Sequence, residues 1–404
     1  MLTASSCATP RATHDARRRA ASRARVYAAV ARAASTPSSS STPSSSTPKP
    51  LCFVFGLGYV GTALAATLTR EGAYEVCGTV RDGDKARRLR AHGIRALVWD
   101  PFRGEEDESG PPSPGAEDDK ARIEDDADVR RMIANELARA SVVISTVPPN
   151  GDLDRDPVLE VFGDVLRDAS GTPSGGRFTG YCSSTSVYGD RGGDWVNENT
   201  PCAPNTPKSR ARYDAERAWH ALAGDGVTTV SYRLGGIYGP GRSAIETAKK
   251  RRSAAAANGG EESASQRARE RRSFTSRVHV GDIVRVIMAS MKLGEKASEV
   301  YNVVDDEPAP RRDAVRYAEN ILGLLTDDST TTTTTTTTTT MTNKTVRGQQ
   351  ARDSVNVEGN RGEKRVENTR IKTELGVELQ FPTYREGLDA LARGDQYPFE
   401  TSSS

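Results

Sequence analysis

Residues 51–61 read LCFVFGLGYVG, and this stretch decides the fold. The residues Leu51 to Phe55 are all apolar, which indicates a short strand that is buried on both faces. A glycine-rich turn follows at once, and Thr62 to Thr69 then shows the spacing of a helix. A strand, a glycine-rich turn and a helix in this order predict the opening βαβ unit of a doubly wound parallel sheet.

The glycine-rich turn fits the pattern G-x-G-x-x-G, in which each glycine has its own task. Gly56 permits the tight turn, Gly58 lets the backbone approach a pyrophosphate, and Gly61 lets the helix pack against the sheet. Tyr59 and Val60 lie between the second and third glycines, and the helix that follows has its N-terminus facing the anion. We therefore expect these five residues to bind a dinucleotide cofactor.

The same alternation continues along the chain. Runs rich in apolar or β-branched residues predict strands, and stretches with helical spacing separate them. The expected strands are 75–80, 96–99, 142–147, 178–183, 228–234 and 299–304, and the expected helices are 85–91, 129–138, 157–168, 208–222, 282–293 and 312–324. This order predicts an α/β fold, a doubly wound parallel (Rossmann) sheet with a small C-terminal substrate lobe.

Three segments interrupt the alternation: an acidic one at 103–126, a basic one at 248–273, and 326–362 with its unbroken run of threonines. Each lacks the apolar residues that an ordered segment buries, so we expect solvated loop insertions. The domain itself is expected to span residues 51–395, and residues 396–404 are expected to form a disordered tail.

The first 50 residues differ in composition from the rest of the chain. They hold eight basic residues against a single acid, Asp15, and they end in a Ser/Thr/Pro tract. Residues 17–30 are compatible with a short basic amphipathic helix. This is the composition of an organellar transit peptide, although a disordered tail shares it. An apolar h-region is missing, which argues against secretion, and the long Ser/Thr stretch favours a plastid (chloroplast) over a mitochondrion.

The overall composition argues against several classes of protein. Lysine plus arginine (56) nearly equals aspartate plus glutamate (54), and the first 50 residues hold the excess, so nucleic acid is not an expected partner. No apolar run approaches the roughly 20 residues that span a bilayer, so no membrane partner is expected either. Five cysteines without C-x-x-C spacing and four scattered histidines predict neither a disulfide framework nor a metal site.

The second expected strand ends in Thr79-Val80-Arg81-Asp82. An NAD-binding fold of this kind has an Asp or Glu at this place, which binds the ribose 2′-hydroxyl, whereas an arginine suits the 2′-phosphate of NADP. Arg81 therefore favours NADP over NAD. Asp82 keeps the choice open because a carboxylate there repels a phosphate, and Arg81 can also be an ordinary solvated arginine.

Further motifs follow in a fixed order. Residues 181–190 read YCSSTSVYGD, residues 233–241 read RLGGIYGPG, and residues 277–283 read RVHVGDI. The first ends a strand with hydroxyl groups at the carboxyl edge of the sheet, where a doubly wound fold keeps its substrate crevice. Asp282, just before a helical stretch, is expected to be an N-cap or first-turn acid.

With these motifs, the sequence resembles the extended and atypical short-chain dehydrogenases/reductases, the group of epimerase/dehydratase-like proteins. Three further features resemble the bacterial YeeZ-type proteins and their plastid relatives: V-P-P at 147–149, the sequence from Tyr188 to Glu198, and K-R-V-E-N at 364–368. The resemblance covers residues 51 to about 392. It implies a Rossmann fold, a nicotinamide cofactor and a small-molecule substrate.

The resemblance also implies roles for individual residues. Ser184 matches the serine or threonine that donates a hydrogen bond to the substrate, and Asp100 matches the acid that contacts the adenine. Val147 and Pro148 occupy a small-residue motif beside the cofactor, where the backbone makes the contact.

The Tyr-x-x-x-Lys pair of this group is not matched. If Glu216 is aligned with the acid four residues after the lysine, Arg212 takes the lysine position and Lys208 the tyrosine position. In a shifted register, Tyr213 takes the tyrosine position and supplies a phenol, and Arg217 takes the lysine position. The YeeZ-type pattern favours the first register, and Tyr213 is then an ordinary surface residue of the helix. Ser184, Tyr213 and Arg212 are thus the candidate catalytic residues.

Two functions remain open from the sequence. The first is an NADP-dependent oxidoreductase or epimerase that acts on a small hydroxylated or nucleotide-sugar-like substrate. The second is a non-catalytic NADP-binding sensor, scaffold or RNA-associated protein. In the second case the basic runs at 249–252 and 267–272 would contact phosphates, although no aromatic residue is interleaved with them.

Overall fold

A computed structural model describes residues 49–102, 126–149, 155–256, 272–324 and 363–399. The transit-peptide prediction for residues 1–50 falls almost entirely outside them, as do the central parts of the three predicted insertions. The chain divides into two compact units. The first holds Met1–Cys182, Asp214–Ser231 and Met291–Glu299, and the second holds Ser183–Tyr213, Tyr232–Ser290 and Val300–Ser404.

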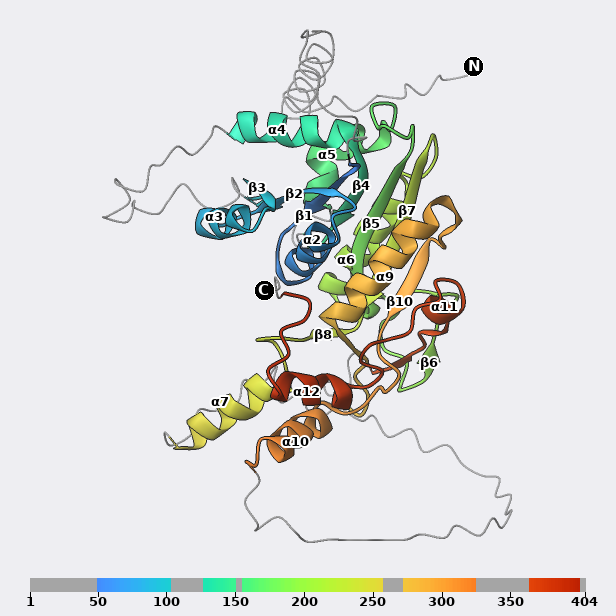
Figure 1. Cartoon of the computed structure of the whole chain (residues 1–404). Coiled ribbons are helices and arrows are strands. Elements are labelled where there is room, and N and C mark those ends of the chain that lie inside the picture. The colour runs from blue at the N-terminus through green and yellow to red at the C-terminus, as the bar shows by residue number, and fades with distance from the viewer. Residues whose placement is uncertain (1–48, 103–125, 150–154, 257–271, 325–362, 400–404) are drawn as a thin grey trace, which may run out of the picture. The chain divides into compact units, whose positions relative to one another are not determined.

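Seven strands form one sheet in the order β10-β7-β5-β4-β1-β2-β3 (Figure 1). The bounds are β1 Leu51–Phe55, β2 Glu75–Val80, β3 Arg95–Val98, β4 Ala140–Ser145, β5 Arg177–Ser184, β7 Val227–Leu234 and β10 Val300–Val303. The neighbours among β1 to β5 pair in parallel. This is the strand order of a doubly wound sheet, so the predicted fold class is confirmed.

The helices that accompany these strands are α2 Tyr59–Glu71, α3 Gly83–Ala91, α4 Asp126–Arg139, α5 Pro157–Arg167, α6 Pro207–His220 and α9 Val280–Leu293. All six were predicted within a few residues. Strand β4 begins and ends two residues earlier than predicted. Val147 is buried in the loop that follows it, and Pro148 and Pro149 cannot donate ladder hydrogen bonds.

Aromatic side chains from strands and helices pack together within the core of the first unit. The rings of Phe55, Trp99 and Phe162 lie 5.3–5.8 Å apart between centroids. Tyr181 stacks on Trp219 at 5.7 Å, and the Trp219 Nε1 donates to Asp156 Oδ2 at 3.0 Å. All residues of β1 are buried, as the continuous apolar run predicts.

A single arginine connects the ends of two helices in the first unit. The Arg177 side chain is only 2 % exposed. Its guanidinium donates to four backbone carbonyls, those of Leu137, Ala140, Val165 and Leu166, at 2.6–3.2 Å. These carbonyls lie at or just beyond the last turns of α4 and α5. The last carbonyls of a helix have no hydrogen-bond donor within the helix, and here one guanidinium supplies it.

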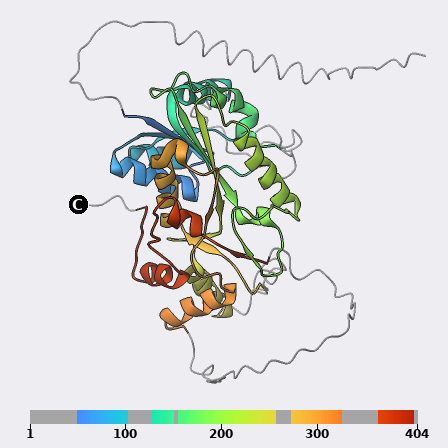
Figure 2. The same ribbon diagram turned by 90° about the vertical axis from the view of Figure 1, so that its right-hand side faces the viewer.

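The second unit contains smaller elements that the sequence did not predict: β6 Trp195–Val196, β8 Gly236–Tyr238, β9 Arg277–His279, β11 Arg365–Val366, α11 Thr369–Thr373 and α12 Tyr384–Ala392. Strands β6 and β11 pair with each other, as do β8 and β9. Helices α7 Ala244–Ala256, α10 Arg311–Ile321 and α12 lie side by side (Figures 1 and 2).

Helix α7 corrects one prediction. Residues 248–273 were expected to be a solvated loop, but 248–256 continue this helix. Ile245 (3 % exposed) and Ala248 (1 %) pack against α10 and α12. The basic run concealed their i, i+3 spacing, which marks the buried face of a helix. Residues 257–271 lie outside the described part of the chain.

The C-terminal segment also differs from the prediction. Residues 396–399 were expected to belong to a disordered tail, but they have defined positions, and the Tyr397 ring packs so closely on Gly281 that a Cβ there would lie 2.3 Å from it. Asp282 lies in the first turn of α9, as predicted. Its buried carboxylate accepts hydrogen bonds from the backbone N–H groups of Gln380 and Phe381.

Within the described residues, no helix has the length and apolar character of a membrane span.

Candidate functional site

The glycine-rich loop lies between β1 and α2, where the sequence predicts it. Gly56 has φ +81°, a left-handed conformation that favours glycine. Its N–H donates to Thr79 Oγ1 at 3.0 Å, and its carbonyl accepts from Thr146 Oγ1 at 2.6 Å. Two threonines on the neighbouring β2 and after β4 therefore fix the position of the turn.

The other two glycines have different surroundings. A Cβ on Gly61 would lie 2.1 Å from the Gly56 carbonyl oxygen, so this position admits no side chain. A Cβ on Gly58 would meet nothing closer than the Gly56 oxygen at 4.0 Å, which is open space. Gly58 is therefore not required by packing. An open glycine in this turn is what the approach of a pyrophosphate to the backbone requires.

The start of α2 is suited to an anion. No acidic residue lies in its first turn, and no side chain caps it. The first backbone N–H groups of a helix have no partner within the helix and attract negative charge. Tyr59 is half-buried, and Val60, at 6 % exposed, packs in the core, so we expect Val60 to contact a cofactor through its backbone only.

The residues expected around the adenosine end of the cofactor also belong to the first unit. Arg81 is exposed directly after β2. Asp82 is the N-cap of α3, because its carboxylate accepts the Lys85 N–H at 2.7 Å. Asp100 follows β3, is half-buried and accepts the Phe102 N–H at 3.0 Å. Val147 is buried and Pro148 is exposed after β4.

The three candidate catalytic residues belong to the second unit. Ser184 ends β5, and its Oγ accepts the Ser186 N–H at 3.2 Å, so it caps the short 3-10 helix Thr185–Tyr188. Arg212 and Tyr213 are half-buried on α6. The Tyr213 ring packs against the hydrophobic cluster of Val187, Tyr188, Val196, Val304 and Val366. This packing gives Tyr213 a structural role whatever its chemistry.

Next to Ser184, a buried polar network was not foreseen from the sequence. The Tyr188 hydroxyl donates to Asn302 Oδ1 at 2.8 Å and accepts from Arg233 Nη1 at 2.9 Å. Glu198 accepts the Asn302 N–H at 2.8 Å. Burial raises the pKa of Tyr188 to about 12, and Arg233 opposes the shift. Tyr188 is fully buried, so we assign it to the support of the turn that carries Ser184.

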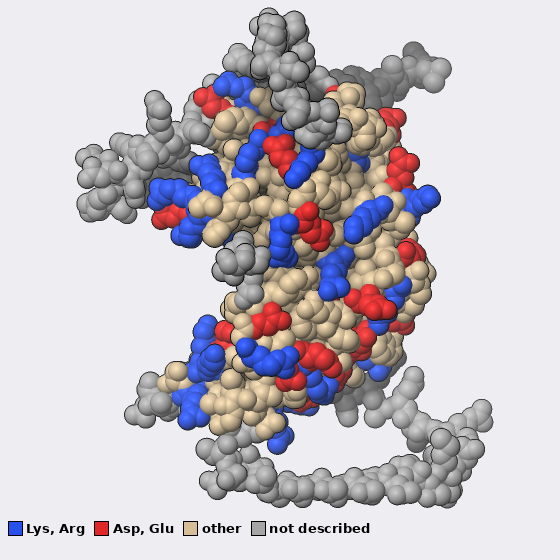
Figure 3. All heavy atoms as spheres, in the orientation of Figure 1, with Lys and Arg blue, Asp and Glu red and all other residues tan. Residues whose placement is uncertain are grey.

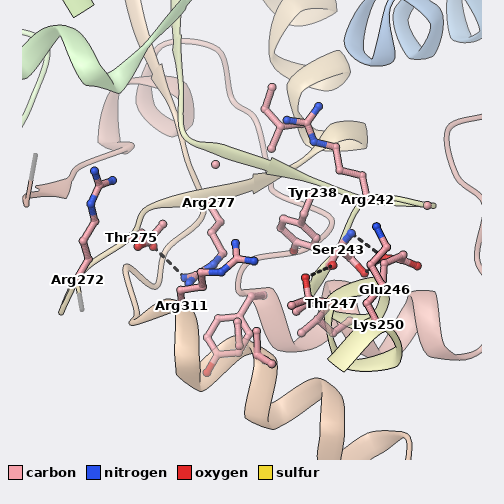
Figure 4. A pocket seen from close by; sticks show the side chains of 18 residues that line it. Tyr238, Arg242, Ser243, Glu246, Thr247, Lys250, Arg272, Thr275, Arg277 and Arg311 are labelled. Atoms are coloured by element: carbon pink, nitrogen blue, oxygen red, sulfur yellow. Dashed lines mark hydrogen bonds between the residues drawn. The ribbon is translucent and has the colours of Figure 1, made fainter. Parts of the chain in front are cut away.

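The second unit also contains a cavity of about 520 Å³ (Figure 4). Helix α7 lines one side, and β8, β9, α10, α12 and the loops before α7 and β9 contribute the rest. Five cationic residues line it, namely Arg242, Lys250, Arg272, Arg277 and Arg311. Its one acid, Glu246, accepts the Ser243 N–H at 2.7 Å and lies 2.6 Å from the Ser243 Oγ. The cavity is therefore strongly positive, and space-filling Figure 3 shows basic side chains gathered over α7.

The cations of the cavity differ in how they are held. Arg277 is buried, and its guanidinium donates to the carbonyls of Thr275, Ala309 and Pro310. Lys250 and Arg311 form no hydrogen bond or ion pair with any other described residue. Beside Arg277 lies Asp305, which is 1 % exposed and whose own N–H donates to the Arg277 carbonyl. Burial raises the pKa of Asp305 well above its usual range.

The sequence did not predict this cavity because its lining comes from five separate segments. Lys250 and Arg272 lie in the basic tract that was interpreted as solvated. Arg277 belongs to the motif at 277–283, whose sequence alone does not indicate a cavity. The one feature of the sequence that pointed to this region was the glycine-rich run 235–241, which brings Tyr238 and Arg242 to the cavity.

Comparison with known proteins supports the assignment of the fold. Residues 167–303 match the model of the NAD dependent epimerase/dehydratase family. This segment is similar to that family over about a third of the chain. The match includes Ser184, Tyr213 and the 233–241 and 277–283 motifs, while the narrower resemblance to the YeeZ type stays a prediction. None of the curated proteins matches this sequence.

Several solved structures are similar to the chain. A conserved protein of unknown function from Silicibacter pomeroyi DSS is 29 % identical, with a TM-score of 0.57 over 86 % of this chain and 100 % of that one. The dTDP-glucose 4,6-dehydratase of Bacillus anthracis, in complex with NAD, is 15 % identical with a TM-score of 0.56 over 85 % and 96 %. The UDP-glucuronic acid 4-epimerase of Bacillus cereus, in complex with NAD, is 16 % identical with a TM-score of 0.53 over 88 % and 100 %.

No group of three or more His, Cys, Asp or Glu side chains in the described ranges is arranged to hold a metal ion.

Proposed function

We propose that this protein is an enzyme that binds a nicotinamide dinucleotide at its glycine-rich loop and acts on a small hydroxylated substrate that carries negative charge, such as a nucleotide sugar. The observation that carries the proposal is the contrast between the three glycines of the loop. Gly56 and Gly61 are explained by φ and packing, whereas Gly58 borders open space, as the approach of a ligand to the backbone requires.

We expect the cofactor to be NADP rather than NAD. Arg81 is exposed at the end of β2, and no described residue bonds to it. Asp82, which counted against NADP, directs its carboxylate to the N-terminus of α3. The complexes of the dehydratase and the epimerase contain NAD, which points the other way, but both proteins are below 20 % identical to this chain.

The bound nicotinamide would supply the hydride chemistry at its C4 atom. Of the chain's own residues, Ser184 is expected to donate a hydrogen bond to the reacting oxygen of the substrate, at the end of a rigid strand. The phenol of Tyr213 is the candidate for moving the proton. Lys208, which takes the tyrosine position in the other register, is exposed near the start of α6.

The cavity of the second unit supports the substrate class. Five cationic residues line the pocket, and the carboxylate of its one acid already accepts hydrogen bonds from Ser243. Such a pocket favours a ligand with at least one phosphate or several carboxylates. A complex of a UDP-glucuronic acid 4-epimerase variant from Bacillus cereus holds UDP-4-deoxy-4-fluoro-glucuronic acid and NAD. By analogy, we propose a nucleotide-sugar-like substrate for this chain.

A non-catalytic NADP-binding role is the alternative, and one observation favours it. Tyr213 packs in a hydrophobic cluster, and the first register places no tyrosine in the catalytic position. NADP-linked activity assays with a panel of nucleotide sugars and hydroxylated phosphates, on protein without residues 1–50, separate the two. Turnover of any substrate establishes the enzyme, whereas tight NADPH binding without turnover on the whole panel favours the binding protein.

The same assay tests Tyr213. If its phenol transfers the proton, Tyr213→Phe lowers kcat by roughly 10² to 10⁴ while the affinity for NADPH is unchanged. We expect the other result, no change in kcat, because Phe preserves the packing and Glu216 supports the first register. Ser184→Ala then carries the loss of turnover. A large effect of Tyr213→Phe would overturn this expectation.

A further inference from the structure

Residues 363–368, which contain the sequence K-R-V-E-N, lie against the chain that follows Ser184. Strand β11 within this segment pairs in parallel with β6. The Glu363 carbonyl accepts the N–H groups of Arg191 and Gly193 at 2.9 and 3.2 Å. Both stretches belong to the second unit, and segment 363–368 lies beyond the part of the chain that matches the family model. The fold therefore brings a late part of the chain to the turn that carries Ser184.

The turn after Ser184 has its backbone carbonyls bonded one after another. The carbonyls of residues 186–189 accept, in order, from the Gly189 N–H, the Ala203 N–H, Arg191 Nε and Lys364 Nζ, at 3.0–3.1 Å. The first three donors belong to residues 189–203, close to the turn in sequence, whereas Lys364 is 175 residues from Gly189. The last carbonyl of the turn is thus held by a side chain of segment 363–368.

Lys364 is a buried cation, 8 % exposed. Burial and the neighbouring Arg272 lower its pKa to about 8, while Asp190 opposes the shift. The ammonium therefore keeps its charge near pH 7, and its hydrogen bond to the Gly189 carbonyl is charge-assisted, which is a stronger class of bond. Gly189 is also buried, with φ +72°, and a Cβ there would lie 2.0 Å from the Ala203 carbonyl oxygen. The end of the turn therefore has little room to move.

Hydrogen bonds lead from Lys364 to the Ser184 hydroxyl. Lys364 Nζ donates to the Gly189 carbonyl at 3.0 Å. The Gly189 N–H donates to the Ser186 carbonyl at 3.1 Å, and the Ser186 N–H donates to Ser184 Oγ at 3.2 Å. Each bond restrains the residue that makes the next one, so the position of the Ser184 hydroxyl depends on the ammonium at the far end.

We propose that Lys364 is a positioning residue for Ser184. This inference rests on the proposed function, in which the Ser184 hydroxyl donates a hydrogen bond to the reacting oxygen of the substrate. Lys364 acts through the turn, because its ammonium bonds to a backbone carbonyl there. A misplacement of about 1 Å costs an enzyme roughly 100-fold in rate, so a fixed turn matters for turnover.

Amide hydrogen exchange at single-residue resolution, on the full chain, tests this link without a substrate. Lys364→Met removes the ammonium and keeps the length of the side chain. We expect the N–H groups of Ser186 and Gly189 to exchange at least about 10-fold faster, the change that loss of a hydrogen bond to a charged group predicts. The N–H groups of Arg191 and Gly193 should exchange as in the wild type, because the backbone carbonyl that accepts them is still present.

Lys372→Met is the matched control, because it removes an exposed lysine of the same C-terminal part, paired with Asp306. It should change none of these rates. Lys364→Gln keeps a neutral donor, should give a smaller acceleration than Lys364→Met, and replaces that variant if it does not fold. Unchanged exchange at Ser186 in the Lys364 variants would overturn the inference. Equal acceleration at Arg191 would also overturn it, because the whole segment would then have detached.

Kinetics on a substrate of the panel test the effect on Ser184. Lys364→Met should lower kcat by about 10- to 100-fold with little change in KM, while the affinity for NADPH stays the same. In the Ser184→Ala background the same replacement should cause no further loss, because the group that it positions is gone. An equal second loss would overturn the inference and make Lys364 a structural residue only. Absence of turnover in the wild type contradicts the proposed function instead, and the exchange result then decides the link between Lys364 and the turn.

Discussion

At the scale of single residues, the proposed cofactor site includes residues that the described part of the fold does not otherwise require. Arg81 is exposed and bonds to no described residue, and Gly58 borders open space. Residues around them, such as Asp82 and Thr79, are already used in hydrogen bonds that shape the loop and the start of α3. The unused groups are therefore the ones whose replacement should affect binding without affecting folding.

Replacement of Arg81 tests the choice of cofactor. We expect Arg81→Ala to weaken NADPH by about 1.5 to 3 kcal/mol, the value of a hydrogen bond to a charged group, and to leave the affinity for NADH unchanged. Calorimetric titration of both nucleotides measures this difference. Arg88→Ala, on the neighbouring helix α3, is the control for the loss of one positive charge. Equal losses for both nucleotides would remove Arg81 from the 2′-phosphate, and tighter wild-type binding of NADH would reverse the cofactor assignment.

His279 gives a prediction for the pH dependence of stability. It is 1 % exposed, its Nδ1 accepts the Gly281 N–H at 3.1 Å, and burial lowers its pKa to about 4. The unfolded chain binds a proton near pH 6.5, whereas the folded protein does not until about pH 4. Stability should therefore fall as the pH decreases from 6.5 to 4, by up to roughly 3 kcal/mol.

Thermal melts across this pH range provide the measurement. His279→Asn keeps an acceptor for the Gly281 N–H and cannot be protonated, so its melting temperature should fall less with pH than that of the wild type. His92→Asn, an exposed histidine, is the control and should follow the wild type. The same pH slope in all three proteins would mean that His279 is not the group responsible.

At the scale of elements, the long segments were predictable and the short ones were not. Strands β1 and β2 match their predicted bounds because their apolar runs end at turn residues. Strands β6, β8, β9 and β11 have two or three residues each, too few for a periodic pattern to appear. Helix α7 was missed because its buried apolar residues, Ile245 and Ala248, stand beside a basic run that reads as solvated.

Replacement of Arg177 tests whether its side chain stabilises the C-terminal ends of α4 and α5. Arg177→Met removes a buried guanidinium and leaves four carbonyls at the ends of α4 and α5 without their donor. A buried carbonyl without a partner costs about 1 to 3 kcal/mol, so we expect the free energy of unfolding to fall by roughly 3 kcal/mol or more. Urea denaturation measures it.

The control for this variant is Arg167→Met, in the last turn of α5. Its exposed ion pair with Asp164, at 3.1 Å, should contribute less than about 1 kcal/mol. If the two variants lose similar stability, the contacts of Arg177 do not hold the helix ends together.

At the scale of the whole molecule, the two units divide the proposed tasks. The first contains the glycine-rich loop, Arg81 and Asp100, and the second contains Ser184, Tyr213 and the cationic cavity. The sequence predicted the first set because its motif is local, within residues 56–100. It did not predict the cavity, since residues from 236 to 388 line it and only the folded chain brings them together.

The central claim is that the loop at Gly58 receives a dinucleotide, and calorimetric titration of NADPH into the wild type and Gly58→Asp tests it most directly. A side chain at Gly58 meets open space, so Gly58→Asp should melt like the wild type. Its carboxylate should occupy the place of the pyrophosphate and repel it, so NADPH binding should be lost, with a smaller loss in Gly58→Ala. Unchanged affinity for NADPH in a folded Gly58→Asp would contradict the account.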